Sequence, residues 1–219
     1  MTTQEKNGIT EGVIWKQLLI FFFPILVGSF FQQLYNTVDS VIVGQFVGKE
    51  ALSSVGGSAG QIISLVVGFF TGVSTGATVI ISQYFGAGKK EEIEESLHTA
   101  YAFALVGGLV LGIAGIVFAP QMLRWMNTPE ELIAESVLYV RVYFSGLIFI
   151  FIYNMGAAIL RAVGDSKRPL YYLIVCSVVN IILDLLLILV IPLGVLGAAI
   201  ATLIAQAVSA VLVTVTLMY

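Results

Sequence analysis

The stretch NIILDLLLILVI, residues 180–191, places one carboxylate, Asp184, inside an otherwise aliphatic run. An aspartate at the centre of a bilayer is unfavourable by roughly 2.5–3.5 kcal/mol on insertion scales. Asn180 precedes it by one helical turn, so the amide and the carboxylate share one helix face. The stretch therefore predicts a membrane-spanning helix. Its acidic residue is unfavourable for insertion, so we expect that Asp184 has a function.

The whole chain has the composition of an integral membrane protein. Of its 219 residues, 58% are hydrophobic and 11% are charged, whereas a soluble domain carries about a quarter charged residues. Six apolar runs are long enough to cross a hydrocarbon core of about 30 Å. They cover residues 15–46, 52–85, 96–119, 133–160, 170–191 and 195–218. We expect an all-α membrane protein, a six-transmembrane-helix bundle formed by residues 14–219, after a cytoplasmic segment at residues 1–13.

The distribution of Lys and Arg predicts the orientation of this bundle. If the N-terminus is cytoplasmic, the cytoplasmic segments hold seven of these residues and the external segments hold two, Lys49 and Arg124. The seven are Lys6, Lys16, Lys89, Lys90, Arg161, Lys167 and Arg168. Because cytoplasmic loops carry the excess of positive charge, both termini are expected in the cytoplasm. We expect a multi-pass protein of the cell membrane, in a bacterium the inner membrane.

Only two of the acidic residues, Asp39 and Asp184, lie well inside the predicted spans. Asp39 belongs to a polar stretch of the first span, which also contains Gln32, Tyr35 and Asn36 at helical spacing. An ionisable residue inside the membrane is a functional candidate by default. Both acids are therefore candidates for binding or translocating a charged species.

Depth in the membrane indicates that polar groups of three helices meet. At a rise of 1.5 Å per residue, Asp39 lies about 14 Å, Asp184 about 11 Å and Thr202 about 12 Å below the outer ends of their helices. These groups are thus expected at one level in the outer half of the membrane, in a single site. Asn154 of the fourth span lies about 12 Å from the cytoplasmic end, at a different level.

Five stretches of the chain resemble the N-terminal half of transporters of the MATE (multidrug and toxic compound extrusion) family. They are FPILVGSFFQQLYNTVDSVIVGQFVGKEALSSVG (23–56), GVSTGATVIISQYFGAGKKEE (72–92), YNMGAAILRAVGDSKRP (153–169), VVNIILDLLLI (178–188) and GVLGAAIATLIAQ (194–206). Together they sample every span except the third. The resemblance implies a twelve-helix protein with two six-helix lobes around a central cavity, of which this chain is the N-terminal lobe. The second lobe is expected in cis or as a second copy.

The resemblance also implies a cation-binding site. Carried over position by position, its members are Asp39, Asn180, Asp184, Thr202 and Ala198, the last through its backbone carbonyl. The implied surrounding polar network is Gln32, Tyr35, Asn36, Tyr139 and Asn154. The coupling ion is H⁺ or Na⁺, for which the five members of the site are the expected ligands, and no other cofactor is expected. Carboxylate, amide, hydroxyl and carbonyl oxygens are the ligand types that a hard cation prefers.

The function expected from the resemblance is secondary active multidrug efflux by cation antiport. The expected substrates are amphipathic, cationic small-molecule drugs. One alternative is a lipid-linked oligosaccharide flippase of the same superfamily. A large basic central cavity would favour this alternative, whereas only Arg141 is available inside the predicted spans. The other alternative is a non-transporting half-protein that assembles with another membrane protein.

Other function classes lack the residues that they need. The spans contain no paired histidines, no His-Glu zinc motif and no serine–histidine arrangement, so an enzyme is not expected. The sequence has no basic patch of the kind that binds nucleic acid, so nucleic acid is not an expected partner. The lipid bilayer is expected to surround the protein. Gly68, Gly72 and Gly76 lie one turn apart, which predicts a tight helix crossing along that face.

Overall fold

The computed structural model describes residues 13–218, and every regular element in this range is helical. Apart from Val13, the predicted cytoplasmic segment lies outside the described residues. The elements are α1 (Ile14–Ile42), η1 (Val43–Val47), α2 (Lys49–Gly56), α3 (Ser58–Gly86), α4 (Lys90–Trp125), α5 (Glu130–Ser145), α6 (Leu147–Ala162), α7 (Lys167–Asp184), η2 (Leu185–Val190) and α8 (Val195–Met218). The short segments η1 and η2 are π-helical continuations of α1 and α7.

The predicted six passes are present in the described residues, but the fourth is broken. Five helices are long and apolar enough to cross a membrane on their own, and the sixth pass is the pair α5 and α6, bent by 48°. The break falls at Gly146, in the middle of the predicted span 133–160. A Cβ atom at Gly146 would lie 3.0 Å from Cγ of Leu203 on α8. At the bend, the backbone of Gly146 therefore packs closely against α8, where a larger side chain would be crowded.

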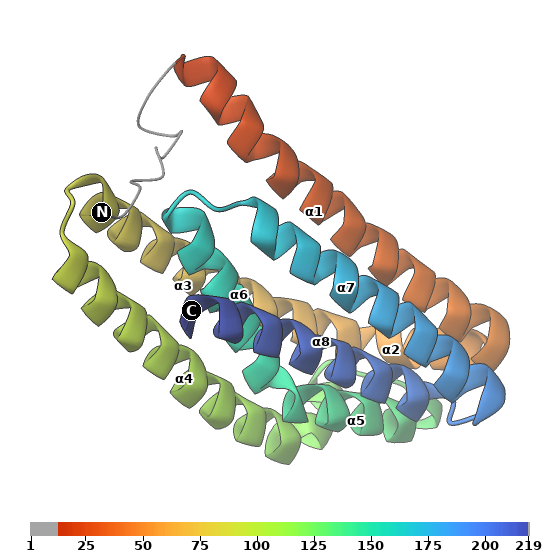
Figure 1. The fold of residues 1–219 in the computed structure, drawn as a ribbon. Helices are drawn as coiled ribbons and strands as arrows, with labels where there is room; N and C mark the ends of the chain where they lie inside the picture. The colour runs from red at the N-terminus through yellow and green to blue at the C-terminus, as the bar shows by residue number, and fades with distance from the viewer. Residues whose placement is uncertain (1–12, 219) are drawn as a thin grey trace.

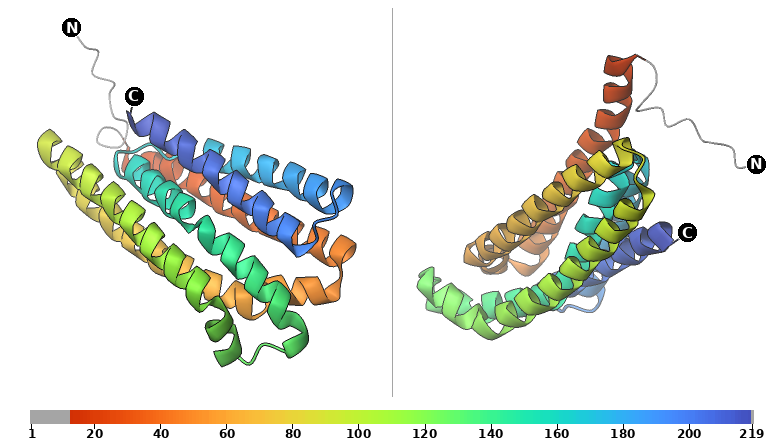
Figure 2. Two further views of the ribbon diagram at one scale, coloured as in Figure 1. Left: turned by 90° about the horizontal axis from the view of Figure 1, so that it is seen from below. Right: turned by 90° about the vertical axis from the view of Figure 1, so that its left-hand side faces the viewer.

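The passes form one bundle in which α6 is central (Figure 1). Helix α1 packs on α7, α7 on α8 and α8 on α6, while α3 and α4 pack on α6 as well. Both views of Figure 2 show α3 and α4 running along each other. The beginning of α1 and the end of α8 lie at the same end of the bundle, which we call the terminal end. The hairpin between α7 and α8 lies at the opposite end.

Glycines of α4, not those of α3, form the tight helix crossing. A Cβ atom on Gly108 would lie 2.7 Å from Cα of Ile148, and one on Gly115 would lie 1.7 Å from the ring of Phe144. The predicted crossing along Gly68, Gly72 and Gly76 is wrong, because a Cβ atom at any of these positions meets nothing within 4 Å. These three glycines lie on an exposed face of α3.

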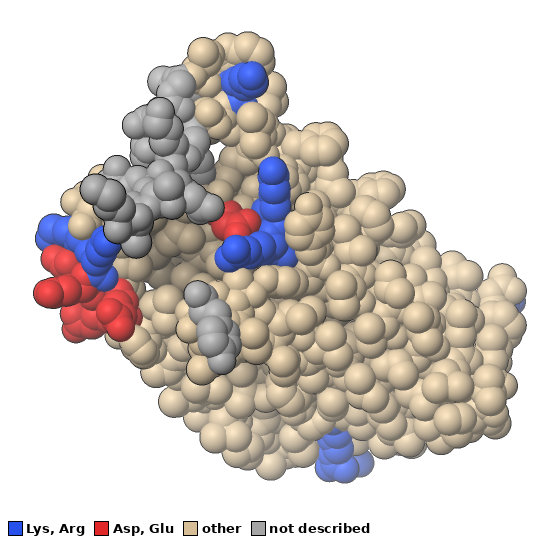
Figure 3. All heavy atoms as spheres, in the orientation of Figure 1, with Lys and Arg blue, Asp and Glu red and all other residues tan. Residues whose placement is uncertain are grey.

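The surface of the bundle is that of a protein surrounded by lipid. Large apolar side chains are exposed along α1, α3, α4, α7 and α8, a pattern that marks contact with a membrane. In Figure 3, charged side chains gather mainly at the terminal end, and most of the visible surface carries none. The first turns of α1 extend beyond the other helices (Figure 2, right) and expose Trp15, Phe22 and Phe23.

Candidate functional site

Asp39 of α1 and Asp184 of α7 face each other where these two helices pack. Their carboxyl groups are close enough to share a hydrogen bond when one of them carries a proton. Asp184 is completely buried and Asn180, one turn earlier, is 1% exposed. Nδ2 of Asn180 donates a hydrogen bond to Oγ1 of Thr202 on α8, with a donor–acceptor distance of 3.5 Å. We call these four residues of three helices the acid cluster.

The acid cluster holds buried oxygen atoms that lack hydrogen-bond donors. Among the described residues, no donor reaches Oδ1 of Asp39, Oδ1 of Asn180 or either carboxylate oxygen of Asp184. Buried polar atoms in proteins are normally paired, so these oxygens form a set that a proton or a small cation can satisfy. In residues 13–218, no three His, Cys, Asp or Glu side chains converge as a metal site. Two carboxylates with neutral oxygens fit Na⁺ or H⁺ by the chemistry of their donors.

Three tyrosines of α1 and α5 lie near enough to Asp39 to interact with it electrostatically. The hydroxyl groups of Tyr35, Tyr139 and Tyr143 all lie within electrostatic range of Asp39, and Tyr139 is also within range of Asp184. The rings of Tyr139 and Tyr143 have centroids 6.1 Å apart. The predicted network members Tyr35 and Tyr139 are thus within electrostatic range of Asp39, and so is Tyr143, the alternative to Tyr139 one turn along α5. Its spacing of one turn from Tyr139 on α5 is the sequence signal for it.

Each acid lies next to a π-helical segment. Asp184 directly precedes η2, and Asp39 lies four residues before η1. Leu187 of η2 approaches α8 closely, because a Cβ atom on Gly197 would lie 3.0 Å from its carbonyl oxygen. Single π-helical turns occur frequently at functional sites. The sequence pattern did not predict these segments.

The other predicted site residues lie at three different places. Ala198 is completely buried on α8, one turn before Thr202. Asn36 is exposed on α1. Gln32 and Asn154 line a separate cavity of about 330 Å³ toward the terminal end, and Nδ2 of Asn154 donates to the carbonyl oxygen of Ile150 in its own helix. Gln32 and Asn154 therefore line the same cavity, and neither Asp39 nor Asp184 is among its lining residues.

The cavity of Gln32 and Asn154 is also lined by Arg161, a residue predicted to lie in a cytoplasmic segment. Arg161 lies in the last turn of α6, half-buried. We call this space the arginine cavity. It is lined by Pro24, Ile25, Gly28, Ser29 and Gln32 of α1, Val67 and Thr71 of α3, Tyr153, Asn154, Ala157 and Arg161 of α6, Ser166, and Pro169, Leu170 and Leu173 of α7.

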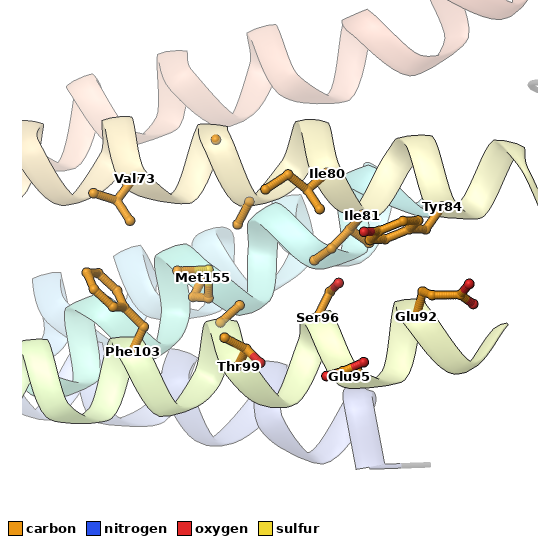
Figure 4. Close-up of a pocket in the computed structure, with 13 residues that line it drawn as sticks. Val73, Ile80, Ile81, Tyr84, Glu92, Glu95, Ser96, Thr99, Phe103 and Met155 are labelled. Carbon is orange, nitrogen blue, oxygen red and sulfur yellow. The ribbon is translucent and has the colours of Figure 1, made fainter. Parts of the chain in front are cut away.

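A larger groove of about 590 Å³ runs between α3 and α4, with Met155 of α6 beside it (Figure 4). Its walls are mainly apolar, with Phe103 toward one end. Tyr84, Glu92 and Glu95 lie toward the other end, at the terminal end of the bundle. Glu92 forms an ion pair with Lys89 at 3.0 Å. The groove thus combines an apolar wall with carboxylates at one end.

Comparison with a family model identifies the chain with the MatE family over residues 24–186. Two curated relatives are from Bacillus subtilis. The probable multidrug resistance protein YoeA is 34% identical over 208 residues, which cover 93% of this chain and 44% of YoeA. The probable multidrug resistance protein YpnP is 34% identical over 91% of this chain and 45% of its own length. The chain thus spans about half the length of the curated relatives that it matches.

Solved structures of this family share the fold. An outward-facing multidrug resistance MATE family transporter of the MOP superfamily matches with a TM-score of 0.91 at 27% identity, over 99% of this chain and 48% of that one. An inward-facing structure of such a transporter matches with a TM-score of 0.80 at 28% identity, over 85% of this chain and 42% of that one. The described bundle therefore matches the outward-facing structure over a larger part of its length.

Proposed function

Because the chain belongs to the MATE family, whose curated relatives include multidrug resistance proteins, we propose that it forms the cation-binding N-terminal lobe of a multidrug antiporter. In this proposal both termini lie in the cytoplasm, and a second six-helix lobe is supplied in cis or by a second copy. The observation that carries the proposal is the acid cluster, in which two carboxyl groups face each other with unpaired oxygens inside a membrane bundle.

The mechanism follows from the charge of these two acids. Two carboxylates held together in a buried place repel each other, so the site is favourable only when a cation occupies it. Binding of H⁺ or Na⁺ from the outer side, through Asp39 and Asp184, draws α1 and α7 together. Moving one charge through about 100 mV supplies about 2.3 kcal/mol, which corresponds to a roughly fiftyfold concentration gradient. Occupancy of the acid cluster thereby drives release of a bound drug and the change between outward and inward states.

The proposed substrates are amphipathic cationic drugs. Curated relatives carry multidrug export in their names. The groove between α3 and α4 combines apolar walls with the carboxylate of Glu95 and with Glu92, which is paired with Lys89 (Figure 4). An apolar wall beside a carboxylate is the chemistry that an amphipathic cation requires.

The test is efflux of a fluorescent amphipathic cation from membrane vesicles that contain the complete transporter. An imposed pH gradient and an imposed Na⁺ gradient are applied separately, so that the coupling ion is read from whichever gradient drives efflux. We expect Asp39→Asn and Asp184→Asn each to abolish gradient-driven efflux, because each removes a charge that the ion neutralises. Arg124→Gln, an exposed charge at the end of α4 that is not part of the acid cluster, serves as a control that keeps efflux. Retained gradient-driven efflux in both Asn variants would contradict the proposal.

A second arm separates the antiporter lobe from a non-transporting half-protein. The chain alone is reconstituted into liposomes and its thermal unfolding is followed with Na⁺, with K⁺ and over a pH series. Ion-dependent stabilisation that Asp184→Asn removes supports the cation site even where the lobe alone transports nothing. If neither Na⁺ nor pH changes the thermal stability of the chain, the result contradicts a cation site at the acid cluster.

A further inference from the structure

Arg161 is a half-buried cation that the proposed antiport mechanism does not use. Within residues 13–218, no hydrogen bond or ion pair to its guanidinium group is found. The phenol group of Tyr153 is the neighbour with which it interacts electrostatically. A partly buried guanidinium group without a counter-charge attracts anions, so the arginine cavity has a net positive charge from Arg161.

The acid nearest to Arg161 in the sequence does not neutralise it. Asp165 pairs instead with Arg168, with Oδ2 3.2 Å from Nε. Its Oδ1 accepts hydrogen bonds from the backbone N–H groups of Lys167 and Arg168 at 3.1 Å. The carboxylate of Asp165 is thus engaged in capping the first turn of α7, and the charge of Arg161 remains for an anion from outside the described chain.

The polar side chains around Arg161 favour a ligand that carries hydroxyl groups besides its anionic group. Ser29 and Thr71 donate their hydroxyl protons to carbonyl oxygens one turn earlier in their own helices. Asn154 likewise donates its amide to Ile150. The side-chain oxygens of these three residues are therefore left as acceptors in the cavity, while the five N–H groups of Arg161 are donors. A phosphate group binds the donors, and hydroxyl groups bind the acceptors.

An apolar hollow adjoins the arginine cavity. It has a volume of about 560 Å³ and shares Pro24 with the cavity. Its other lining residues are Leu19, Ile20, Phe22 and Phe23 of α1, together with Lys167 at the beginning of α7. Phe22 and Phe23 are exposed. A polar cavity with a cation thus continues into an apolar surface with a second cation at its margin.

We propose that the arginine cavity and this hollow bind one anionic phospholipid from the leaflet at the terminal end. The phosphate lies at Arg161 with Lys167 close by, the glycerol headgroup lies among the acceptors of the cavity, and one acyl chain follows the first half of α1. Basic pockets between transmembrane helices bind anionic lipid headgroups in other membrane proteins. The bound lipid bridges α1 to α6 and α7, and it holds the projecting part of α1 in place.

The test uses the complete purified chain in a neutral detergent, with thermal unfolding followed by tryptophan fluorescence. Three probes are added separately: dioleoylphosphatidylglycerol, dioleoylphosphatidylcholine with the same chains, and glycerol 3-phosphate without chains. We expect the phosphatidylglycerol to raise Tm by about 5–10 °C at roughly a hundred times its dissociation constant. The other two probes are expected to produce less than half of that shift. In native mass spectrometry, phosphatidylglycerol is expected to remain bound where phosphatidylcholine is lost.

The variants locate the site. Arg161→Gln is expected to remove most of the phosphatidylglycerol shift, and Arg124→Gln, a matched change at the opposite end, is expected to keep it. Because Arg161→Gln can fail to fold, the double variant Phe23→Ser with Lys167→Gln provides a second test, since both side chains are exposed. An equal shift with phosphatidylcholine, an equal shift with glycerol 3-phosphate, or an unchanged shift in Arg161→Gln or in the double variant each overturns the proposal. The first result means binding without charge recognition, and the second means a site for soluble anions.

Discussion

The acid cluster and the arginine cavity both lie between α1 and α7, but they bury charge in different ways. In the acid cluster, the carboxyl groups of Asp39 and Asp184 are packed against each other, and Asp184 has no exposed surface. In the arginine cavity, the guanidinium group of Arg161 borders about 330 Å³ of space lined by polar side chains. The two sites thus differ in sign of charge and in the room around it.

This difference determines which ligand each site can hold. The pair of acids, with Asp184 completely shielded from solvent, fits a proton or a bare monovalent ion. The arginine cavity has room for a polyatomic anion and its hydroxyl groups. Helices α1 and α7 therefore border the proposed cation site toward one end and, with α3 and α6, the proposed anion site toward the other. Matched changes at the two places test whether the proposed sites are independent.

The largest expected effect comes from replacing the amide side chain of each site by leucine. Asn180→Leu removes an oxygen beside Asp184 and the hydrogen bond to Thr202. Hydrogen bonds to charged groups are worth about 1.5–3 kcal/mol, so we expect the affinity for the coupling ion to fall roughly ten- to hundredfold. Asn154→Leu, in the arginine cavity, is expected to leave that affinity unchanged. Ion-dependent thermal unfolding measures both, and equal losses in the two variants would show that the sites are one.

A smaller effect is expected from adding one methyl group beside each site. In Gly197→Ala the new Cβ would lie 3.0 Å from the carbonyl oxygen of Leu187, which pushes η2 away from α8. Such overpacking reduces the free energy of unfolding by about 1–2 kcal/mol. In Gly28→Ala, beside the arginine cavity, the new atom meets Leu170 and Leu173 at 3.7 Å, an ordinary contact, and alanine favours the helix by about 0.5–1 kcal/mol. Thermal unfolding in detergent should give Tm changes of opposite sign, and a loss of Tm in both variants would contradict the close approach of η2 to α8.

The smallest effect is expected from the threonine hydroxyl groups. Thr202→Val removes the long hydrogen bond between α7 and α8, and such interhelical bonds in membranes average about 0.6 kcal/mol. We expect a roughly threefold weaker ion response. Thr71→Val removes a hydroxyl group that donates only within α3, and the ion response should not change. Titration of Na⁺ or H⁺ against Tm measures the difference, and an unaltered midpoint in Thr202→Val would remove Thr202 from the ion site.

The part of the site that periodicity could predict is the part on unbroken helices. Asp39, Asp184 and Thr202 were placed at one depth from a constant rise per residue, and the structure brings them together because α1, α7 and α8 are continuous up to these positions. Asn154 lies beyond the 48° bend at Gly146. Helical spacing does not predict this bend. The direction in which α6 presents Asn154 could therefore not be predicted from the spacing of residues in α5.

Two other features depended on contacts between segments far apart in the chain. Arg161 was predicted to lie in a cytoplasmic segment because it directly follows the apolar run 133–160, yet it lines a cavity together with residues of α1 and α3. The glycines of α3 and α4 have similar spacing, but Gly108 and Gly115 meet Ile148 and Phe144 while Gly72 meets nothing. Which glycine stripe is covered depends on where the broken pass packs, and this is a property of the assembled bundle.

The amino-acid sequence by itself determined that this chain spans a membrane, how many passes it makes and which two acids stand in hydrocarbon surroundings, because hydropathy and helical spacing are local properties. Only the tertiary structure decided that these acids face each other, that π-helical segments follow them, and that Arg161 enters a cavity with Gln32 and Asn154. The physical reason is that pairing and enclosure of charge depend on helix bends and on packing between distant segments, and neither is encoded in the spacing along one helix.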